Sequence, residues 1–173
     1  MKDIGQNIDG FVSEGELEWL YEQALKMETI VEIGSWMGKS TYALCTGCKG
    51  KVYAVDHFRG SVEHYYRMRT GLDLYGIFMN NMKEFTNLEV FKMTSEEASK
   101  SKLIPEFVDM VFIDGSHDYN SVISDFRLWY PRVKKLFCGH DYAQDGVPMA
   151  LKEYFGDLPQ EVSEHTALWM VQL

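Results

Sequence analysis

The sequence has little positive charge, few cysteines and no long apolar run, and each shortage narrows what the chain does. Its 17 Lys and Arg residues stand against 26 Asp and Glu residues, which gives a formal net charge of −9. Because such a chain lacks a broadly basic surface, we expect neither a nucleic-acid nor a membrane partner. No stretch is long enough to span a bilayer and no signal-peptide pattern is present, so we expect a cytoplasmic location.

The three cysteines are too few, and odd in number, for a disulfide framework. Cys45 and Cys48 form a single C-x-x-C pair. A zinc site would need two further ligands, such as Cys138 and His140. We favour the simpler interpretation that the cysteines are buried apolar residues.

What the sequence does contain is enough apolar material for one folded domain over residues 1–173. It is 46% hydrophobic and 14% aromatic, which predicts a sizeable core. Short apolar runs alternate with segments of helical periodicity, the pattern of an α/β fold. Strands are expected at residues 30–33, 52–55, 88–92, 108–113, 136–137, 161–163 and 167–173, with a helix capped by Ser13 and Glu16, and others near 38–46, 74–82, 94–97, 119–130 and 151–155.

The chain is organised around residues 29–41, where a buried strand reaches Gly34 and a helix opens at Gly38. Such a turn presents backbone N–H groups and the positive end of a helix to a ligand. A Walker A loop is excluded because its first glycine would fall at Ile33. A dinucleotide fingerprint is excluded because Trp36 and Lys39 occupy its second and third glycine positions. The remaining pattern, E-x-G-x-x-x-G, resembles motif I of class I S-adenosylmethionine-dependent methyltransferases, and it leaves Lys39 and Ser40 as ordinary residues of the first helical turn.

Acidic residues follow three of the expected strands. Asp56 ends the second strand, about 20 residues after the turn, where a carboxylate would accept hydrogen bonds from ribose hydroxyls. Asp114 and Asp141 follow two strands expected to be parallel neighbours, about 4.8 Å apart. Their carboxylates would then share Mg²⁺, or another divalent cation if the imidazole of His140 joins them.

Residues 57–70 are rich in aromatic residues, His and Arg and follow a strand end, where loops line the ligand crevice of an α/β sheet. We predict that they form part of a substrate lid, with Arg59 and His64 as the residues to test.

Four segments in order carry a wider resemblance: residues 31–35, 38–41, 113–119 and 139–142. Together they are similar to the small class I methyltransferase family that includes macrocin-type sugar O-methyltransferases and cephalosporin-hydroxylase-like proteins. The similarity spans residues 28–155. It implies a Rossmann-like three-layer sandwich with a mostly parallel seven-stranded sheet whose last strand is antiparallel.

The resemblance also implies roles for individual residues. S-adenosylmethionine would lie over the first strand ends, with the loop after the third strand at the adenine. The implied cofactor-binding residues are Glu32, Gly34, Ser35, Trp36, Gly38, Asp56, His57, Ser95 and Asp114. The implied metal ligands are Asp114 and Asp141, with His140 standing where the family has an acid.

The predicted activity is methyl transfer to a hydroxyl of a small, sugar-like acceptor. Ser116 stands where some family members have an acidic general base, so we assign that role to His117, whose imidazole titrates near neutrality. Asp114 is the second candidate catalytic residue. Two questions stay open: whether the chain is instead a non-catalytic S-adenosylmethionine-binding or assembly module, and whether it forms a homo-oligomer.

Overall fold

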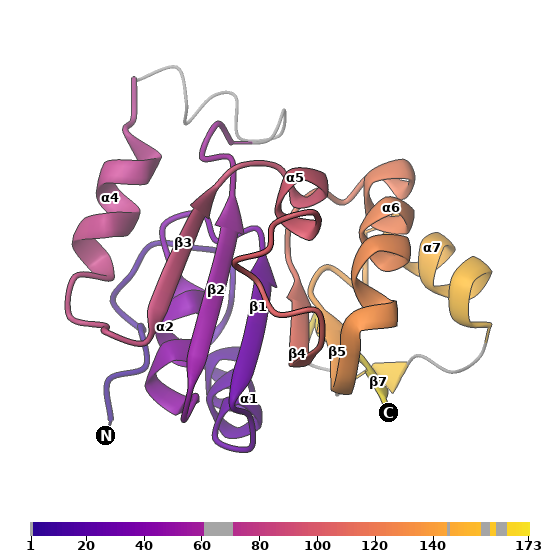
Figure 1. Cartoon of the computed structure of the whole chain (residues 1–173), viewed down its shortest axis with the longest axis horizontal. Helices are drawn as coiled ribbons and strands as arrows, with labels where there is room; N and C mark the ends of the chain where they lie inside the picture. Colours follow the sequence, from indigo (N-terminus) through magenta and orange to yellow (C-terminus); the bar gives the residue numbers. More distant parts are fainter. Residues whose placement is uncertain (1, 61–70, 145, 157–159, 162–165) are drawn as a thin grey trace.

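The computed structural model describes residues 2–60, 71–144, 146–156, 160–161 and 166–173. Helices and strands alternate along most of these segments (Figure 1). In chain order they are α1 (Glu14–Ala24), β1 (Thr29–Ile33), α2 (Lys39–Gly47), β2 (Lys51–Asp56), α4 (Leu74–Asn81), β3 (Leu88–Lys92), α5 (Ser95–Ser99), β4 (Val108–Ile113), α6 (Tyr119–Trp129), the 3₁₀ turn η2 (Tyr130–Arg132), β5 (Val133–Gly139), α7 (Gly146–Phe155), β6 (Gln160–Glu161) and β7 (Trp169–Gln172).

The strands form one seven-stranded sheet in the order β3-β2-β1-β4-β5-β7-β6. The strands β1 to β5 pair in parallel, whereas β7 runs antiparallel to both β5 and β6. The predicted α/β sheet with its antiparallel last strand is therefore confirmed. Ile33 pairs with Ile113, and Ile113 pairs with Gly139, so the carboxyl ends of β1, β4 and β5 lie level with one another.

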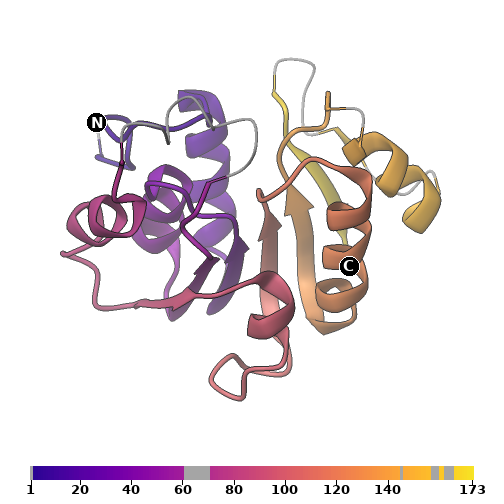
Figure 2. The same cartoon turned by 90° about the horizontal axis from the view of Figure 1, so that it is seen from above.

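Helices cover both faces of the sheet, and the two faces have separate cores (Figure 2). Successive residues of a strand point to opposite faces. In β1, Ile30 packs with α1 and α2, whereas Val31 packs with α5, α6 and α7. A third cluster places α4 beside α2 at the β2 end of the first face. The result is the expected three-layer sandwich. No helix in the described part of the chain is both long and apolar enough to cross a membrane.

Both predicted capping boxes are present. Ser13 and Glu16 cap α1, and Thr94 and Glu97 cap α5, each through reciprocal side-chain and backbone hydrogen bonds. These exchanges satisfy N–H groups that a helix start leaves without an intrahelical partner.

One strand is longer than the sequence pattern indicates. The strand β5 begins at Val133, three residues before the expected start at Leu136. Lys134 and Lys135 are exposed, whereas Leu136 to Gly139 are buried. A search for apolar runs finds only the buried half of such a strand.

Candidate functional site

The turn between β1 and α2 is held by backbone geometry that favours glycine. Gly34 has φ +89° and Gly38 has φ +94°, both in the left-handed region. A Cβ on Gly34 would lie 2.1 Å from the carbonyl oxygen of Asp114. The turn therefore packs directly against the chain that leaves β4, which joins the predicted cofactor turn to the predicted catalytic loop.

Glu32 lies beneath this turn and is fully buried. Its carboxylate accepts hydrogen bonds from the hydroxyls of Ser35 (2.7 Å), Ser40 (2.7 Å) and Thr41 (2.5 Å). Burial raises the pKa of Glu32 to about 7, although the three hydroxyl donors act in the opposite direction. Glu32 therefore holds the two ends of the turn together and does not line the cavity described below.

Glu32→Gln is expected to flatten the pH dependence of stability. The folded-state pKa of about 7 exceeds the ordinary value of 4.5, so the folded protein holds an extra proton between these pH values. Stability from this group is present at low pH and is lost as pH rises through about 7, a change of roughly 2–4 kcal/mol. Urea unfolding measures the stability of both proteins at pH 5 and at pH 8. The stability lost between these pH values should be larger in the wild type than in Glu32→Gln by this amount. An equal change of stability between pH 5 and pH 8 in the two proteins would contradict the raised pKa of Glu32.

Asp56, at the end of β2, binds the same turn from the other side. Its Oδ2 accepts hydrogen bonds from the backbone N–H groups of Ser35 (3.0 Å) and Trp36 (2.9 Å). Its Oδ1 accepts from the N–H of Phe58 at 2.6 Å. Asp56 thus stabilises the turn in addition to lining the cavity, and its role toward a ribose stays a prediction.

A cavity of about 780 Å³ lies over the carboxyl ends of the strands. One part is lined by the turn and by the ends of β2 and β3, and another by the loops after β4 and β5 and by α6. Of the predicted site residues, it brings together Gly34, Ser35, Trp36, Asp56, His57, Ser95, Asp114, His117 and Asp141. Gly38 and His140 lie just outside its lining.

Four contributions to the cavity do not follow from the sequence pattern. Lys39 and Ser40 line it, although they were expected to be ordinary first-turn residues. Residues 10–12, which show no periodicity, also reach it, because Gly10 packs against the Lys39 side chain. Asp125, on α6, is the fourth. A sequence pattern does not reveal contacts of this kind between distant segments.

The predicted lid is only partly within the described residues. His57 and Gly60 line the cavity, which agrees with a role at its mouth. The ring of His57 is 46% exposed and its Nδ1 accepts a hydrogen bond from the N–H of Arg59. His64 and the rest of residues 61–70 lie outside the part that the structure describes, so the lid stays a prediction.

Asp114, His140 and Asp141 gather at the level ends of β4 and β5. His140 Nδ1 lies 3.5 Å from Asp114 Oδ1 and 3.2 Å from Asp141 Oδ1. Its Nε2 lies 3.4 Å from Glu16 Oε1, which comes from α1 behind the sheet. Asp141 Oδ2 lies 2.7 Å from His117 Nε2, so Asp141 contacts both histidines. The expected meeting of the acidic strand ends is confirmed.

Charges within this cluster shift one another strongly. Burial by itself lowers the pKa of His140, but Asp141, Glu16 and Asp114 outweigh it and raise that pKa to about 11. Burial, together with the nearby Asp141 and Glu32 carboxylates, raises the pKa of Asp114 to about 8 against the pull of the two histidines. Burial alone would raise the pKa of Asp141, but both histidines hold it well below the usual range. Near neutral pH the cluster therefore contains an imidazolium, an ionised Asp141 and a largely protonated Asp114.

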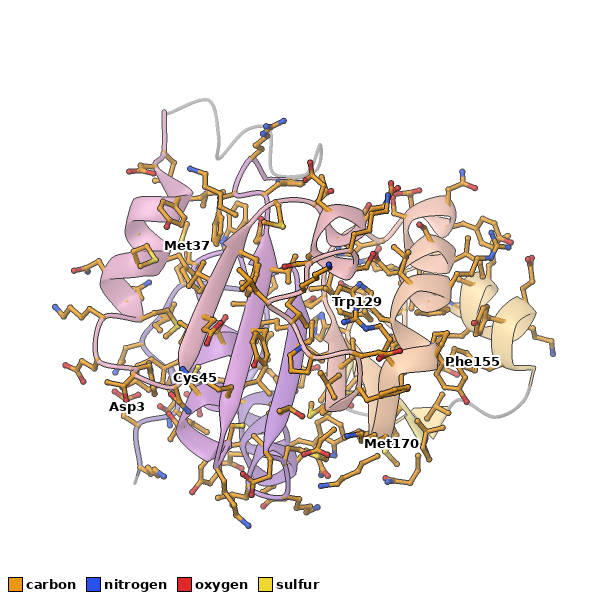
Figure 3. The ribbon with its side chains drawn as sticks, in the orientation of Figure 1. Asp3, Met37, Cys45, Trp129, Phe155 and Met170 are labelled. Carbon is orange, nitrogen blue, oxygen red and sulfur yellow. The ribbon has the colours of Figure 1, made fainter. Side chains whose placement is uncertain are left out.

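The cysteines are buried and belong to the core, as expected. Cys45, which Figure 3 labels, and Cys48 belong to the core on the face of the sheet that α1 and α2 cover. Burial raises the pKa of each thiol. Within the described residues, the one group of three or more side chains arranged to hold a metal ion is Asp114, His140 and Asp141, with no cysteine.

Comparison with solved structures places the architecture among methyltransferases. An O-methyltransferase from Bacillus cereus, solved in complex with SAH, superposes with a TM-score of 0.65 at 16% identity, over 96% of this chain and 85% of that chain. A precorrin-6y C5,15-methyltransferase from Geobacter metallireducens gives a TM-score of 0.69 at 12% identity, over 98% and 96%. A TDP-rhamnose 3′-O-methyltransferase of calicheamicin biosynthesis gives 0.60 at 12% identity, over 90% and 76%. At these identities the likeness shows the fold.

The curated relatives match this chain over only part of their length. An uncharacterised protein of Acanthamoeba polyphaga mimivirus is 29% identical over 111 residues, which cover 62% of this chain and 47% of that protein. An uncharacterised protein of Sinorhizobium fredii is 26% identical over 122 residues, or 66% of this chain and 13% of that protein. The chain therefore spans half or less of these relatives.

A family described as a methyltransferase domain matches residues 31–142. This segment contains the turn after β1, Asp56, Asp114, His117 and Asp141, which line the cavity, and it covers more than half of the chain. The chain belongs to this methyltransferase-domain family.

Proposed function

We propose that the chain transfers the methyl group of S-adenosylmethionine to a hydroxyl of a small, sugar-like acceptor. The observation that carries the proposal is a shared cavity in which the glycine turn faces the Asp114, His117 and Asp141 side chains. The turn is suited to the cofactor, and His117, paired with Asp141, is suited to proton removal. One structural neighbour was solved with SAH and another methylates TDP-rhamnose, which supports the cofactor and the acceptor class.

Methyl transfer to a hydroxyl requires an aligned nucleophile and a group that accepts its proton. His117 fits the second requirement because it lines the cavity and its Nε2 bonds Asp141. A carboxylate that accepts from Nε2–H fixes the orientation of an imidazole and its tautomer, in which Nδ1 is the nitrogen that carries no proton. Asp114, largely protonated near pH 7, would donate a hydrogen bond to the acceptor oxygen.

The Asp114, His140 and Asp141 side chains fit a divalent cation. Their ligand atoms lie within 4.8 Å of one another, compatible with ligands about 2.0–2.2 Å from a shared ion. They adjoin a cavity of about 10 Å³, close to the smallest that holds one water. When bound, the ion would stabilise negative charge on an acceptor oxygen. Two carboxylates suit Mg²⁺, whereas the imidazole favours Mn²⁺ or a similar ion.

Binding of such an ion is expected to strengthen steeply with pH. The ion needs the neutral form of His140, whose pKa of about 11 keeps it protonated at ordinary pH. Each unit of pH then raises the neutral fraction of His140 about tenfold, and below about pH 8 it also raises the ionised fraction of Asp114. The Mn²⁺ dissociation constant should therefore fall about tenfold per unit above pH 8 and more steeply below it. Titration calorimetry at pH 6.5, 7.5 and 8.5 measures this, with Asp114→Asn as the control that weakens binding. A pH-independent constant in Asp114→Asn, where only His140 still has to lose a proton, would show that His140 is not a ligand.

The test of the function is a binding and turnover experiment. Calorimetry should show binding of S-adenosylmethionine. It should show no heat when NAD is added, because the turn lacks the glycines of the dinucleotide fingerprint. Turnover to S-adenosylhomocysteine is then measured with a panel of hydroxylated acceptors, with and without EDTA. No heat with S-adenosylmethionine would refute the proposal. Binding without turnover for any acceptor would favour the second candidate, a non-catalytic cofactor-binding or assembly module, which the partial coverage of longer relatives supports.

Three further expectations belong to this proposal. They are a single domain over residues 1–173, a cytoplasmic location, and a small-molecule acceptor without nucleic-acid or membrane partners. A homo-oligomer would be tested by light scattering during the same measurements.

A further inference from the structure

One buried side chain connects α1 to the strand ends of the candidate site. Glu16, in the first turn of α1, is 4% exposed. Its Oε2 accepts hydrogen bonds from the backbone N–H and the hydroxyl of Ser13 at 2.7 and 2.9 Å, which is the capping box of α1. Its Oε1 accepts from the N–H of Ala167 at 2.7 Å and lies 3.4 Å from Nε2 of His140. Capping accounts for the first oxygen only, so the second has a separate role.

Asp141 has a backbone conformation that depends on its neighbours. Its φ is +61°, in the left-handed region that residues other than glycine adopt only occasionally. Such a conformation persists where the surrounding contacts determine it. With this backbone, Asp141 Oδ2 lies 2.7 Å from His117 Nε2 and Oδ1 lies 3.2 Å from His140 Nδ1. A change of φ at Asp141 would therefore move its carboxylate relative to His117.

The contacts on both sides of Asp141 lead to Glu16. Before it, the imidazole of His140 faces Glu16 Oε1 directly. After it, the N–H of Tyr142 donates to the carbonyl oxygen of Ala167 at 2.9 Å, and the N–H of Ala167 donates to the same Glu16 oxygen. The two residues that flank Asp141 are thus both held by Glu16, one directly and the other through Ala167.

We propose that Glu16 is a positioning residue that holds Asp141 in the conformation in which its carboxylate orients His117. The inference rests on the proposed function, because His117 is the proposed base. Glu16 belongs to α1, on the face of the sheet opposite α6, and it does not line the cavity. Its effect on turnover therefore has to pass through the residues that it contacts.

The first test is kinetic. Glu16→Ala removes both contacts of Oε1, and misplacement of a catalytic group lowers turnover strongly. The turnover number should fall at least about tenfold, whereas the KM for S-adenosylmethionine should stay within about threefold. In an Asp141→Asn background the same change should lower the turnover number less than about threefold, because residues that act as a unit give non-additive effects.

The second test needs no activity. Hydrogen exchange, followed by NMR in the metal-free protein, measures how well each amide is held. The amides of Tyr142 and Ala167 should exchange at least about tenfold faster in Glu16→Ala than in the wild type. The amides of β4 should keep their rates and provide the internal reference.

Two control variants separate positioning from capping. Glu97 is the capping-box glutamate of α5 and does not line the cavity, so Glu97→Ala makes the same substitution away from Asp141. Ser13→Ala weakens the cap of α1 but leaves Oε1 of Glu16 with Ala167 and His140. Both should keep wild-type turnover and wild-type exchange at Tyr142 and Ala167.

The outcomes separate this inference from the proposed function. A wild type without turnover for any acceptor refutes the function, and hydrogen exchange then still tests the anchoring by Glu16. Turnover within about threefold of the wild type in folded Glu16→Ala, an additive loss with Asp141→Asn, or unchanged exchange at Tyr142 and Ala167 refutes the role of Glu16 and leaves the function standing. If Glu16→Ala does not fold, Glu16→Asp, whose carboxylate is one methylene shorter, provides the same comparison.

Discussion

Replacing His117 by alanine is expected to lower the turnover number by about 10²–10⁴-fold, the usual contribution of a general base. The affinity for S-adenosylhomocysteine should change by less than about threefold, because His117 lies at the end of β4 and not at the glycine turn that is proposed to hold the cofactor. Single-turnover kinetics and calorimetry on the same protein measure the two quantities. Retention of more than a tenth of the wild-type turnover would rule out His117 as the base.

A double-mutant cycle with Asp141→Asn tests how the base works. Asp141 Oδ2 lies 2.7 Å from His117 Nε2, so the carboxylate is proposed to act by orienting the ring. Two residues that act as a unit give strongly non-additive effects. The double variant should therefore be about as slow as His117→Ala alone. Additive losses would show that Asp141 has a separate role, such as holding a metal ion, and thermal unfolding of each variant checks that the fold is intact.

The fold was predictable because the signals that specify it are local. All six residues of β4 are buried, and the sequence shows them as one continuous apolar run except for Asp109. The capping boxes of α1 and α5 each lie within four residues of sequence. Parallel strand order then follows from the alternation of strands and helices, and it brings Asp114 and Asp141 to one edge.

The remaining features depend on contacts that no local pattern shows. Ser95 and Asp125 are 30 positions apart, and their hydrogen bond exists only because α5 and α6 pack on the same face. Glu16 is visible in the sequence as a capping residue, but one oxygen also accepts from the N–H of Ala167, 151 positions away, and faces His140. The second contact of such a side chain can be identified only from the tertiary structure.

The glycine turn shows how a local motif acquires its meaning from distant partners. Its spacing predicts a ligand-binding turn, yet the N–H groups of Ser35 and Trp36 already bond Asp56. Glu32 supports the helix start from below through three hydroxyls. Lys39 is the one Lys or Arg among the described residues that line the cavity. The turn is thus prearranged by two carboxylates before any ligand binds.

Gly34→Ala is expected to destabilise the protein more than any surface change. An alanine at φ +89° costs about 1–2 kcal/mol. Its Cβ would also lie 2.1 Å from the Asp114 carbonyl oxygen and 2.6 Å from the Gly115 Cα, both backbone atoms. Forcing the β1 and β4 loops apart adds about 1–3 kcal/mol. Urea unfolding should therefore show a total loss of roughly 2–5 kcal/mol.

Two other glycines provide matched controls for this variant. Gly71 has φ +68° and no described residue within 4 Å of its Cβ position, so Gly71→Ala should cost only the backbone term of about 1–2 kcal/mol. Gly15 lies exposed in α1, and no residue in the described part of the chain lies within 4 Å of its Cβ position, so Gly15→Ala should stabilise the protein by about 0.5–1 kcal/mol. If Gly34→Ala lost no more stability than Gly71→Ala, the close approach of the two loops would not be a constraint. If it also kept wild-type turnover, the cavity would not depend on that approach either.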